Sequence, residues 1–193
     1  LPFAVRFFGI TYASLFVNAN GSISFVKPRA AFLPAQLTAA PADATDPDRA
    51  LPVPMIAPFL ADIDTSDGSD RLVSYGSDAD SFCVQWADAR QYGGTARDTF
   101  QLLLRKVGAD GDFDLVLNYD RLAWDTGSSA QGVPASAVAG FGDGTGTAGT
   151  SVRFAGSGSA GSLLDDGVNA LVGGNQNATR PGRYVVRFRN ADT

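Results

Sequence analysis

The sequence predicts an all-β fold: a two-sheet β-sandwich of about ten mostly antiparallel strands, with long loops and at most one short helix. Apolar and polar residues alternate with a period of two from end to end, and no window of helical length sustains a period of 3.6. The 22 glycines and 10 prolines divide the chain into short segments, which is typical of strands joined by tight turns. The length of 193 residues predicts a single domain over residues 1–193.

The first predicted elements are a hairpin and a long loop. Residues 12–25 form the hairpin, because Asn20-Gly21 is a strong signal for a two-residue turn between apolar runs. Residues 28–54 hold six prolines among many alanines, which favours a long surface excursion over a strand. We expect this excursion to be peripheral to the core, to be cut first by proteases, and to be shortened at little cost in stability.

The remaining strands follow from the same alternation. In residues 113–124, Phe113, Leu115 and Leu117 share one face, and Asn118 lies on the other, so this strand is expected to be half-buried. Residues 162–172 are an apolar patch in a Gly-rich and Ser-rich region, and either a short helix or a loop fits them. Strands are also predicted over residues 55–60, 71–76, 81–86, 98–107, 137–142, 151–156 and 183–189.

The composition argues against several classes of function. All 20 acidic residues are Asp, 13 of the 15 basic residues are Arg, and histidine is absent. Without an imidazole, a Ser–His–Asp or Cys–His hydrolase has no proton relay near neutral pH, and with one cysteine a zinc site is equally disfavoured. A net charge of -5 argues against nucleic acid as a partner. No apolar run reaches the ~18 residues that membrane insertion requires.

Two other binding or catalytic chemistries need no histidine. An Asp-dependent glycoside hydrolase requires two carboxylates, and Asp62 and Asp64 are formal candidates because alternate strand residues share a face. Neither is marked as an acid in an apolar pocket, so a turn or an ion site is favoured. A carbohydrate-binding platform needs exposed aromatic rings, whereas alternation favours core packing for the four candidates, Trp86, Tyr92, Tyr119 and Trp124.

Several short motifs in a specific order resemble the nidogen-like (NIDO) domain over roughly residues 3–189. The strongest are residues 12–25, the IAPF and ADID pieces of residues 56–64, and TFQ at 99–101 followed by Asn118-Tyr119 and Trp124. The resemblance implies a non-catalytic extracellular adhesion or matrix-interaction module of a larger secreted or cell-surface protein, with an extracellular protein or glycan as partner. The abundance of Ala, Asp and Arg, with no Glu or His, indicates a bacterial member. Asn177-Ala178-Thr179 is a formal N-glycosylation acceptor.

Four carboxylates lie within nine residues, at Asp62, Asp64, Asp67 and Asp70. Like charges this close repel, so either solvent screens them in a hairpin turn built on Asp67-Gly68, or a cation does. Calcium suits an oxygen-only loop. The segment is no EF-hand, because Gly68 is at the seventh position from Asp62 and Val73 stands where a bidentate Glu is needed.

The calcium hypothesis predicts a stabilisation that calorimetry can detect. With a dissociation constant of about 10⁻⁴ M, as in extracellular modules, ~10 mM calcium should add roughly 2.7 kcal/mol to the free energy of unfolding. The melting temperature in calcium should therefore exceed that in chelator. Identical melting temperatures in calcium and in chelator would contradict calcium binding and favour the solvated hairpin turn.

Overall fold

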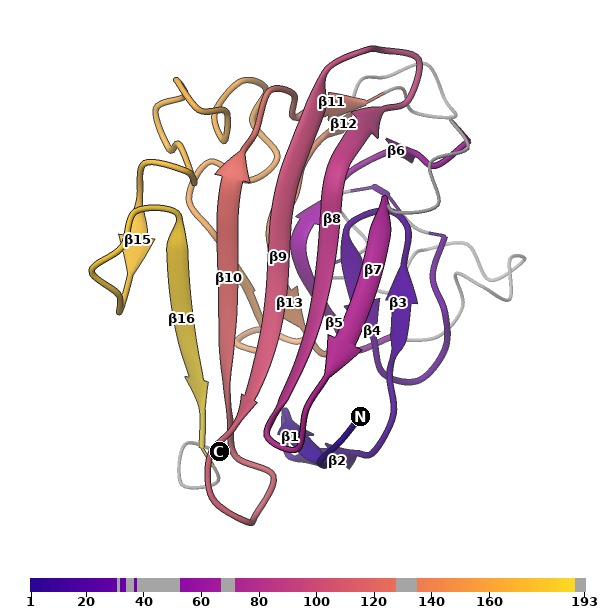
Figure 1. Cartoon of the computed structure of the whole chain (residues 1–193), viewed down its shortest axis with the longest axis vertical. Coiled ribbons are helices and arrows are strands. Elements are labelled where there is room, and N and C mark those ends of the chain that lie inside the picture. Colours follow the sequence, from indigo (N-terminus) through magenta and orange to yellow (C-terminus); the bar gives the residue numbers. More distant parts are fainter. Residues whose placement is uncertain (31, 34–36, 38–52, 67–71, 128–134, 190–193) are drawn as a thin grey trace.

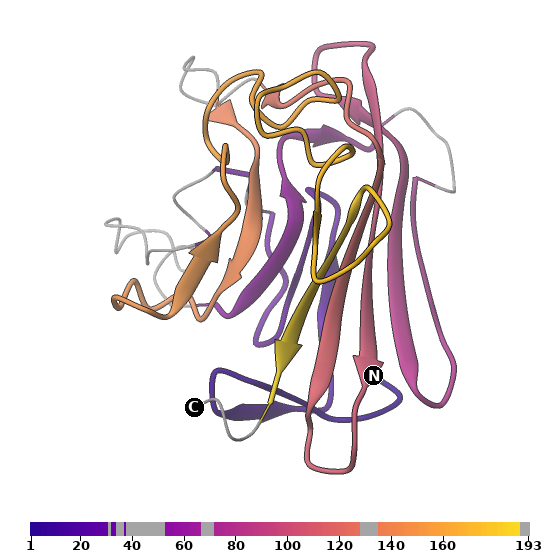
Figure 2. The same cartoon turned by 90° about the vertical axis from the view of Figure 1, so that its left-hand side faces the viewer.

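The computed structural model describes residues 1–30, 32–33, 37, 53–66, 72–127 and 135–189. It confirms the all-β prediction, as two sheets packed face to face and not closed into a barrel (Figures 1 and 2). The described residues include no α-helix. Consequently, within these ranges no helix is long and apolar enough to span a membrane.

The larger sheet has seven strands in the order β15-β16-β10-β9-β8-β6, with β7 also pairing with β8. Neighbouring strands in this sheet are antiparallel, except for β15 and β16, which are parallel. The strands are β6 (Ile63–Asp64), β7 (Val73–Ser77), β8 (Ser81–Gln91), β9 (Arg97–Lys106), β10 (Phe113–Arg121), β15 (Asn175–Gln176) and β16 (Arg183–Phe188).

The smaller sheet has five strands in the order β14-β13-β5-β4-β3, and two separate pairs are β1 with β2 and β11 with β12. Sixteen strands are formed by the described residues, more than the ten or so expected, because many have only two or three residues and are too short to show alternation. The bounds are β1 (Val5–Phe7), β2 (Ile10–Tyr12), β3 (Phe16–Asn18), β4 (Ser22–Ser24), β5 (Met55–Leu60), β11 (Thr126–Gly127), β12 (Ala135–Ser136), β13 (Val138–Gly142) and β14 (Ser151–Arg153).

The β3–β4 hairpin is present, but its loop has three residues rather than two. Asn18 pairs with Ser22, so Ala19, Asn20 and Gly21 form the connection. Gly21 has φ +76°, as expected for a three-residue loop that ends in the left-handed region. A Cβ on Gly21 would lie 1.8 Å from the carbonyl oxygen of Phe59, so the close approach of β5 also requires glycine here.

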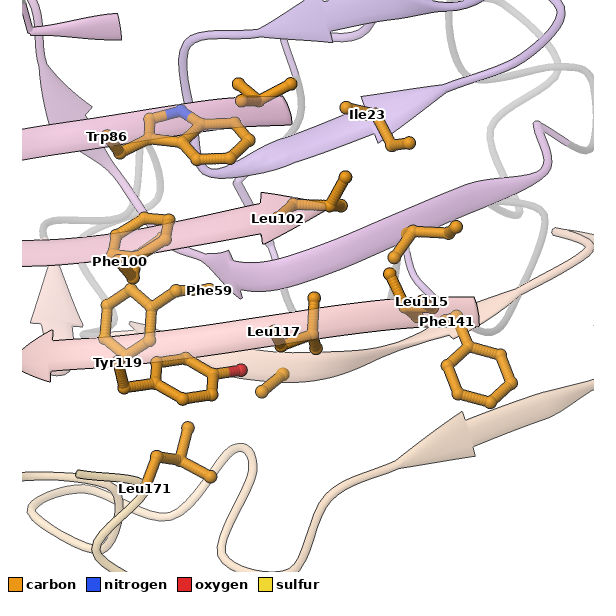
Figure 3. Packing of buried hydrophobic residues seen from close by; sticks show 14 of the residues in the cluster. Ile23, Phe59, Trp86, Phe100, Leu102, Leu115, Leu117, Tyr119, Phe141 and Leu171 are labelled. Atoms are coloured by element: carbon orange, nitrogen blue, oxygen red, sulfur yellow. The ribbon is translucent and has the colours of Figure 1, made fainter. Parts of the chain in front are cut away.

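The main core lies between the two sheets and is rich in aromatic rings (Figure 3). Trp86 and Phe100, opposite each other on β8 and β9, stack with ring centroids 5.2 Å apart, and Phe59 of β5 packs against Phe100 at 5.4 Å. The Tyr119 hydroxyl donates to the Pro58 carbonyl, 2.8 Å away. The prediction of core packing is thus confirmed for three of the four candidate rings, those of Trp86, Tyr119 and Trp124; Tyr92 is exposed.

A second aromatic cluster closes the core beside β1. Phe7 is its centre, with ring centroids 5.1 Å from Phe25, 6.4 Å from Phe141 and 5.3 Å from Phe188. Phe113 stacks on Phe188 at 4.6 Å. This cluster therefore joins the first strand of the chain to the last one.

A third set of contacts corrects the prediction for residues 28–54. Leu37 is fully buried in a cluster with Met55, Ala57, Leu60 and Val138. All six residues of β5 are buried, because this central strand is covered on both faces. Of the excursion only residues 28–30, 32–33, 37 and 53–54 are described. The expectation that it is peripheral is wrong at Leu37, which covers the face of β5 away from the main core.

Residues 162–172 form successive turns, so the loop is the correct alternative. Carboxylates bind backbone N–H groups to hold this region against the segment that follows β10. Asp125 accepts from Gly161 N at 2.9 Å, and Asp165 accepts from Leu122 N at 2.7 Å. These bonds satisfy backbone donors that a loop cannot pair with itself.

Asp98 on β9 belongs to the same arrangement and is fully buried. Its Oδ1 accepts from Ala123 N at 2.7 Å and Trp124 N at 3.2 Å, whereas Oδ2 has no partner in the described part of the chain. Burial raises the pKa of Asp98 to about 8, because a charged carboxylate is poorly solvated there, and nearby Asp165 adds to the rise in pKa. At neutral pH Asp98 is therefore mainly protonated in the folded protein.

Truncation of Leu37 tests the second core. Leu37→Ala should lower the free energy of unfolding by about 2–5 kcal/mol, because it leaves a cavity between the excursion and β5. The control is Val26→Ala, at a side chain that is 56% exposed, where the change should be within about 0.5 kcal/mol. The free energy of unfolding is measured by urea unfolding. Equal losses of this free energy in the two variants would show that Leu37 is peripheral to the core after all.

The buried carboxyl of Asp98 predicts a pH-dependent stability. Between about pH 4 and pH 8 the folded protein holds a proton on Asp98 that the unfolded chain has lost, so this contribution to stability falls by about 1.4 kcal/mol per pH unit as pH rises. It is fully present below about pH 4. Asp98→Asn keeps an acceptor for Ala123 and Trp124 but cannot titrate. Urea unfolding at pH 5 and pH 8 should show wild type losing stability relative to this variant; parallel changes would contradict the assignment.

Candidate interaction surface

The structure describes two of the four aspartates proposed as calcium ligands. Asp62 directly precedes β6 and Asp64 ends it, while Asp67 and Asp70 lie outside the described residues. Both oxygens of Asp64 are engaged: Oδ1 accepts from the N–H and the hydroxyl of Ser66 at 2.8 and 2.6 Å, and Oδ2 forms an ion pair with Arg90. The hydrogen bonds from Ser66 and the bond from Arg90 lower the pKa of Asp64.

These contacts bear on two of the chemistries considered for the acidic segment. A cation at Asp64 would have to compete with Arg90, and the residues described form no group of three acidic, His or Cys side chains able to hold a metal. Calcium binding by the full set stays a prediction. A glycosidase acid needs a raised pKa, which is the opposite of what Ser66 and Arg90 impose on Asp64.

A different set of side chains stands out on the outer face of the larger sheet. Gln85 on β8 pairs with Gln101 on β9, Gln101 pairs with Asn118 on β10, and Asn118 pairs with Arg183 on β16. Directly opposed residues project from the same face of a sheet, so these four form a straight line across four adjacent strands. We call Gln85, Gln101, Asn118 and Arg183 the polar row.

Hydrogen bonds run along the polar row in one direction. Arg183 Nε donates to Asn118 Oδ1 at 2.8 Å, and Asn118 Nδ2 donates to Gln101 Oε1 at 2.9 Å. A donor chain that starts at a guanidinium polarises each following amide, which strengthens the donors at its far end. Within the described residues, the amide NH₂ of Gln101 and the exposed side chain of Gln85 have no hydrogen-bond partner in the protein, so both are available to solvent.

Two further rows run parallel to the polar row on the same face, both on the same side of it. An apolar row of partly and fully buried side chains comes next, and beyond it a charged row. The pairing places Cys83, Leu103, Val116 and Val185 in the apolar row and Ser81, Arg105, Asp114 and Arg187 in the charged row. Cys83 is therefore half-buried on the outside of the sheet rather than in the core, and burial raises the pKa of its thiol.

The polar row forms the floor of a hollow of about 270 Å³. One wall is the turn of residues 180–182, whose Gly182 carbonyl accepts from Tyr119 N at 2.8 Å and so fixes the turn beside β10. Asp120 and Arg180 also line the hollow and are both exposed. The arrangement presents hydrogen-bond donors, acceptors and charges of both signs to solvent without an acid or a nucleophile in an apolar setting.

Sequence reasoning missed the polar row, although part of the signal was present. Each member from the central strands is a polar residue beside a buried aromatic one, in Gln85-Trp86, Phe100-Gln101 and Asn118-Tyr119. That alternation predicts that each amide points outward. It does not predict that the three strands align these amides, because the register depends on pairings between distant segments.

Comparison with known proteins places the chain in a family. The family model described as NIDO related matches residues 1–131, and the nidogen-like domain model matches residues 77–190. Alpha-tectorin of Mus musculus is 30% identical over 167 residues, which cover 72% of this chain and 7% of alpha-tectorin. The chain thus spans a small part of that relative, and no solved structure matches.

These matches support the expected family and leave one expectation untested. The family and the alpha-tectorin match point to an extracellular, matrix-type module. A bacterial source stays a prediction from composition. With two family models that each cover more than half of its residues, the chain belongs to the nidogen-like domain family.

Proposed function

We propose that this domain is a non-catalytic interaction module, used in adhesion or matrix assembly, that binds an extracellular protein or glycan through the polar row. The observation that carries the proposal is the alignment of Gln85, Gln101, Asn118 and Arg183 across four strands on an exposed face. An amide-rich line on a rigid sheet is preorganised, so a ligand loses less free energy in ordering it than in ordering a loop.

The polar row is suited to a ligand rich in hydrogen-bond acceptors. Its donor chain ends on the Gln101 amide, and Arg180 adds a cation at the rim of the hollow. Hydroxyl and carboxylate oxygens of a glycan and the carbonyl groups of an extended peptide share this chemistry. Both sources of ligand therefore remain within the proposal.

The two alternative functions receive less support from the geometry. A carbohydrate-binding module built on stacking needs exposed rings, but of its four candidate rings Trp86, Tyr119 and Trp124 are in the core and only Tyr92 is exposed. A glycan bound at the polar row would be held by hydrogen bonds. A glycoside hydrolase needs an accessible acid with a raised pKa; Asp98 has the raised pKa but is fully buried.

A row variant tests the proposal. The triple variant Gln85→Ala, Gln101→Ala and Asn118→Ala should weaken binding roughly 100-fold, because each lost hydrogen bond contributes about 1 kcal/mol. Binding is measured on a glycan array and on a panel of purified matrix proteins.

The matched control for the row variant is the pair Asp110→Asn and Ser159→Ala, in exposed loops away from the polar row. The control should bind like wild type, and thermal melting should show that both variants are folded. An unchanged affinity in the folded triple variant would place the binding surface elsewhere on the domain.

A further inference from the structure

One lateral side of the sandwich, next to β16, is only partly closed. β15 pairs with Arg183 and Tyr184, the first two residues of β16, and Asn177 Nδ2 donates to the Val185 carbonyl at 3.0 Å. In Figure 2, which faces this side, the chain between β14 and β16 lies over the upper part of the sandwich. Among the described residues, β15 and Asn177 cover this edge of β16 only as far as Val185.

The backbone of Arg187 is the next free position along that edge. Peptide groups of alternate residues in a strand point the same way, and the Val185 carbonyl points outward to Asn177. The N–H and C=O of Arg187 therefore point outward too, whereas those of Val186 point to β10. No backbone hydrogen bond to Arg187 on this side occurs within the described ranges. Arg187 thus offers one donor and one acceptor to an added strand.

An apolar hollow of about 240 Å³ lies beside this free edge. It opens between the two sheets where Val186 and Phe188 of β16 face Phe141 of β13, and Phe8 from the loop after β1 completes its wall. The volume suits one large apolar side chain. A strand added to β16 would turn every second side chain toward the inner face, and one of these side chains would enter the hollow.

The rim of the hollow is positively charged. The Arg187 side chain is exposed and has no ion-pair partner in the described part of the chain. Arg6 also lines the hollow, and its buried Nε has no hydrogen-bond partner in the residues described. Within the described residues neither Arg6 nor Arg187 forms an ion pair, although the chain has a net charge of -5. Charge complementarity therefore favours an anionic occupant.

We propose that an extended acidic peptide of a partner protein binds here as an added strand on β16. Its backbone bonds to the N–H and C=O of Arg187, and one apolar side chain fills the hollow. The residues on either side of that apolar one point to the outer face, where the Arg187 side chain lies, so acidic residues are preferred there.

A peptide accounts for more of these features than a small amphipathic anion does. The anion would use the hollow and the two guanidinium groups, but it would leave the outward N–H and C=O of Arg187 unpaired. Strand addition uses all three and is a recurrent mode of peptide recognition. The site lies on the side of the sandwich and does not include the polar row, so it stands independently of the function proposed for that row.

The test uses the probe peptide acetyl-Thr-Ser-Thr-Asp-Phe-Asp-Thr-Ser-Thr-amide, titrated into the domain and followed by NMR. We expect saturable binding, slower hydrogen exchange at the Arg187 amide, and at least ~10-fold weaker binding by Arg187→Glu. Arg105→Glu is the matched control, because it makes the same charge change in the charged row on β9, away from the hollow. It should bind like wild type.

Peptide variants supply the remaining controls. Replacement of both aspartates by lysine, or of the phenylalanine by serine, should each weaken binding at least ~10-fold. The proposal is overturned if the probe peptide does not bind, if the lysine peptide binds equally well, or if Arg187→Glu and Arg105→Glu have the same effect. Binding that leaves exchange at the Arg187 amide unchanged would overturn strand addition.

Discussion

The buried indole of Trp86 is the contact on which the arrangement of the two sheets depends. Its ring stacks on Phe100 within the larger sheet, and its Nε1 donates to the carbonyls of Asn18 and Ala19 in the hairpin of the smaller sheet, at 3.3 and 3.1 Å. An indole N–H left unpaired in the core would cost about 1–3 kcal/mol, so the hairpin has one favourable position over β8. Because Trp86 points inward, Gln85 must point outward, and the contact that joins the sheets also orients the polar row.

The strands and their inward faces were predictable from the sequence, because a period of two is a local property. The alternation in residues 113–124 identified which side chains enter the core. The pairing between strands was not predictable, since it depends on contacts over long separations. β8 illustrates this: its register with β9 shifts between Trp86 and Ala89, where Asp88 has φ +55°. Without knowledge of that shift, the positions that share a row cannot be assigned from the sequence.

The acidic residues show a second limit of local reasoning. The high density of aspartates in residues 62–70 suggested a site there. The described carboxylates that organise the fold lie far from that segment and from one another in the sequence. Asp98, Asp125 and Asp165 bind backbone N–H groups of two loops and so determine how these loops cross. A side chain that binds a remote backbone group leaves no pattern in its own neighbourhood. Leu37 is similar, because a single apolar anchor in an Ala-rich and Pro-rich segment has no periodicity.

The aromatic cluster around Phe7 joins the first strand of the fold to the last. Phe7 of β1 packs on Phe188 of β16, and Phe188 stacks on Phe113 of β10. If residues flanking β1 and β16 are pulled apart, the shortest path for the force runs through these rings. The stack of Trp86 on Phe100 lies outside that path. Tension along the chain would therefore act on the contact between Phe7 and Phe188 before it reaches the stack around Trp86.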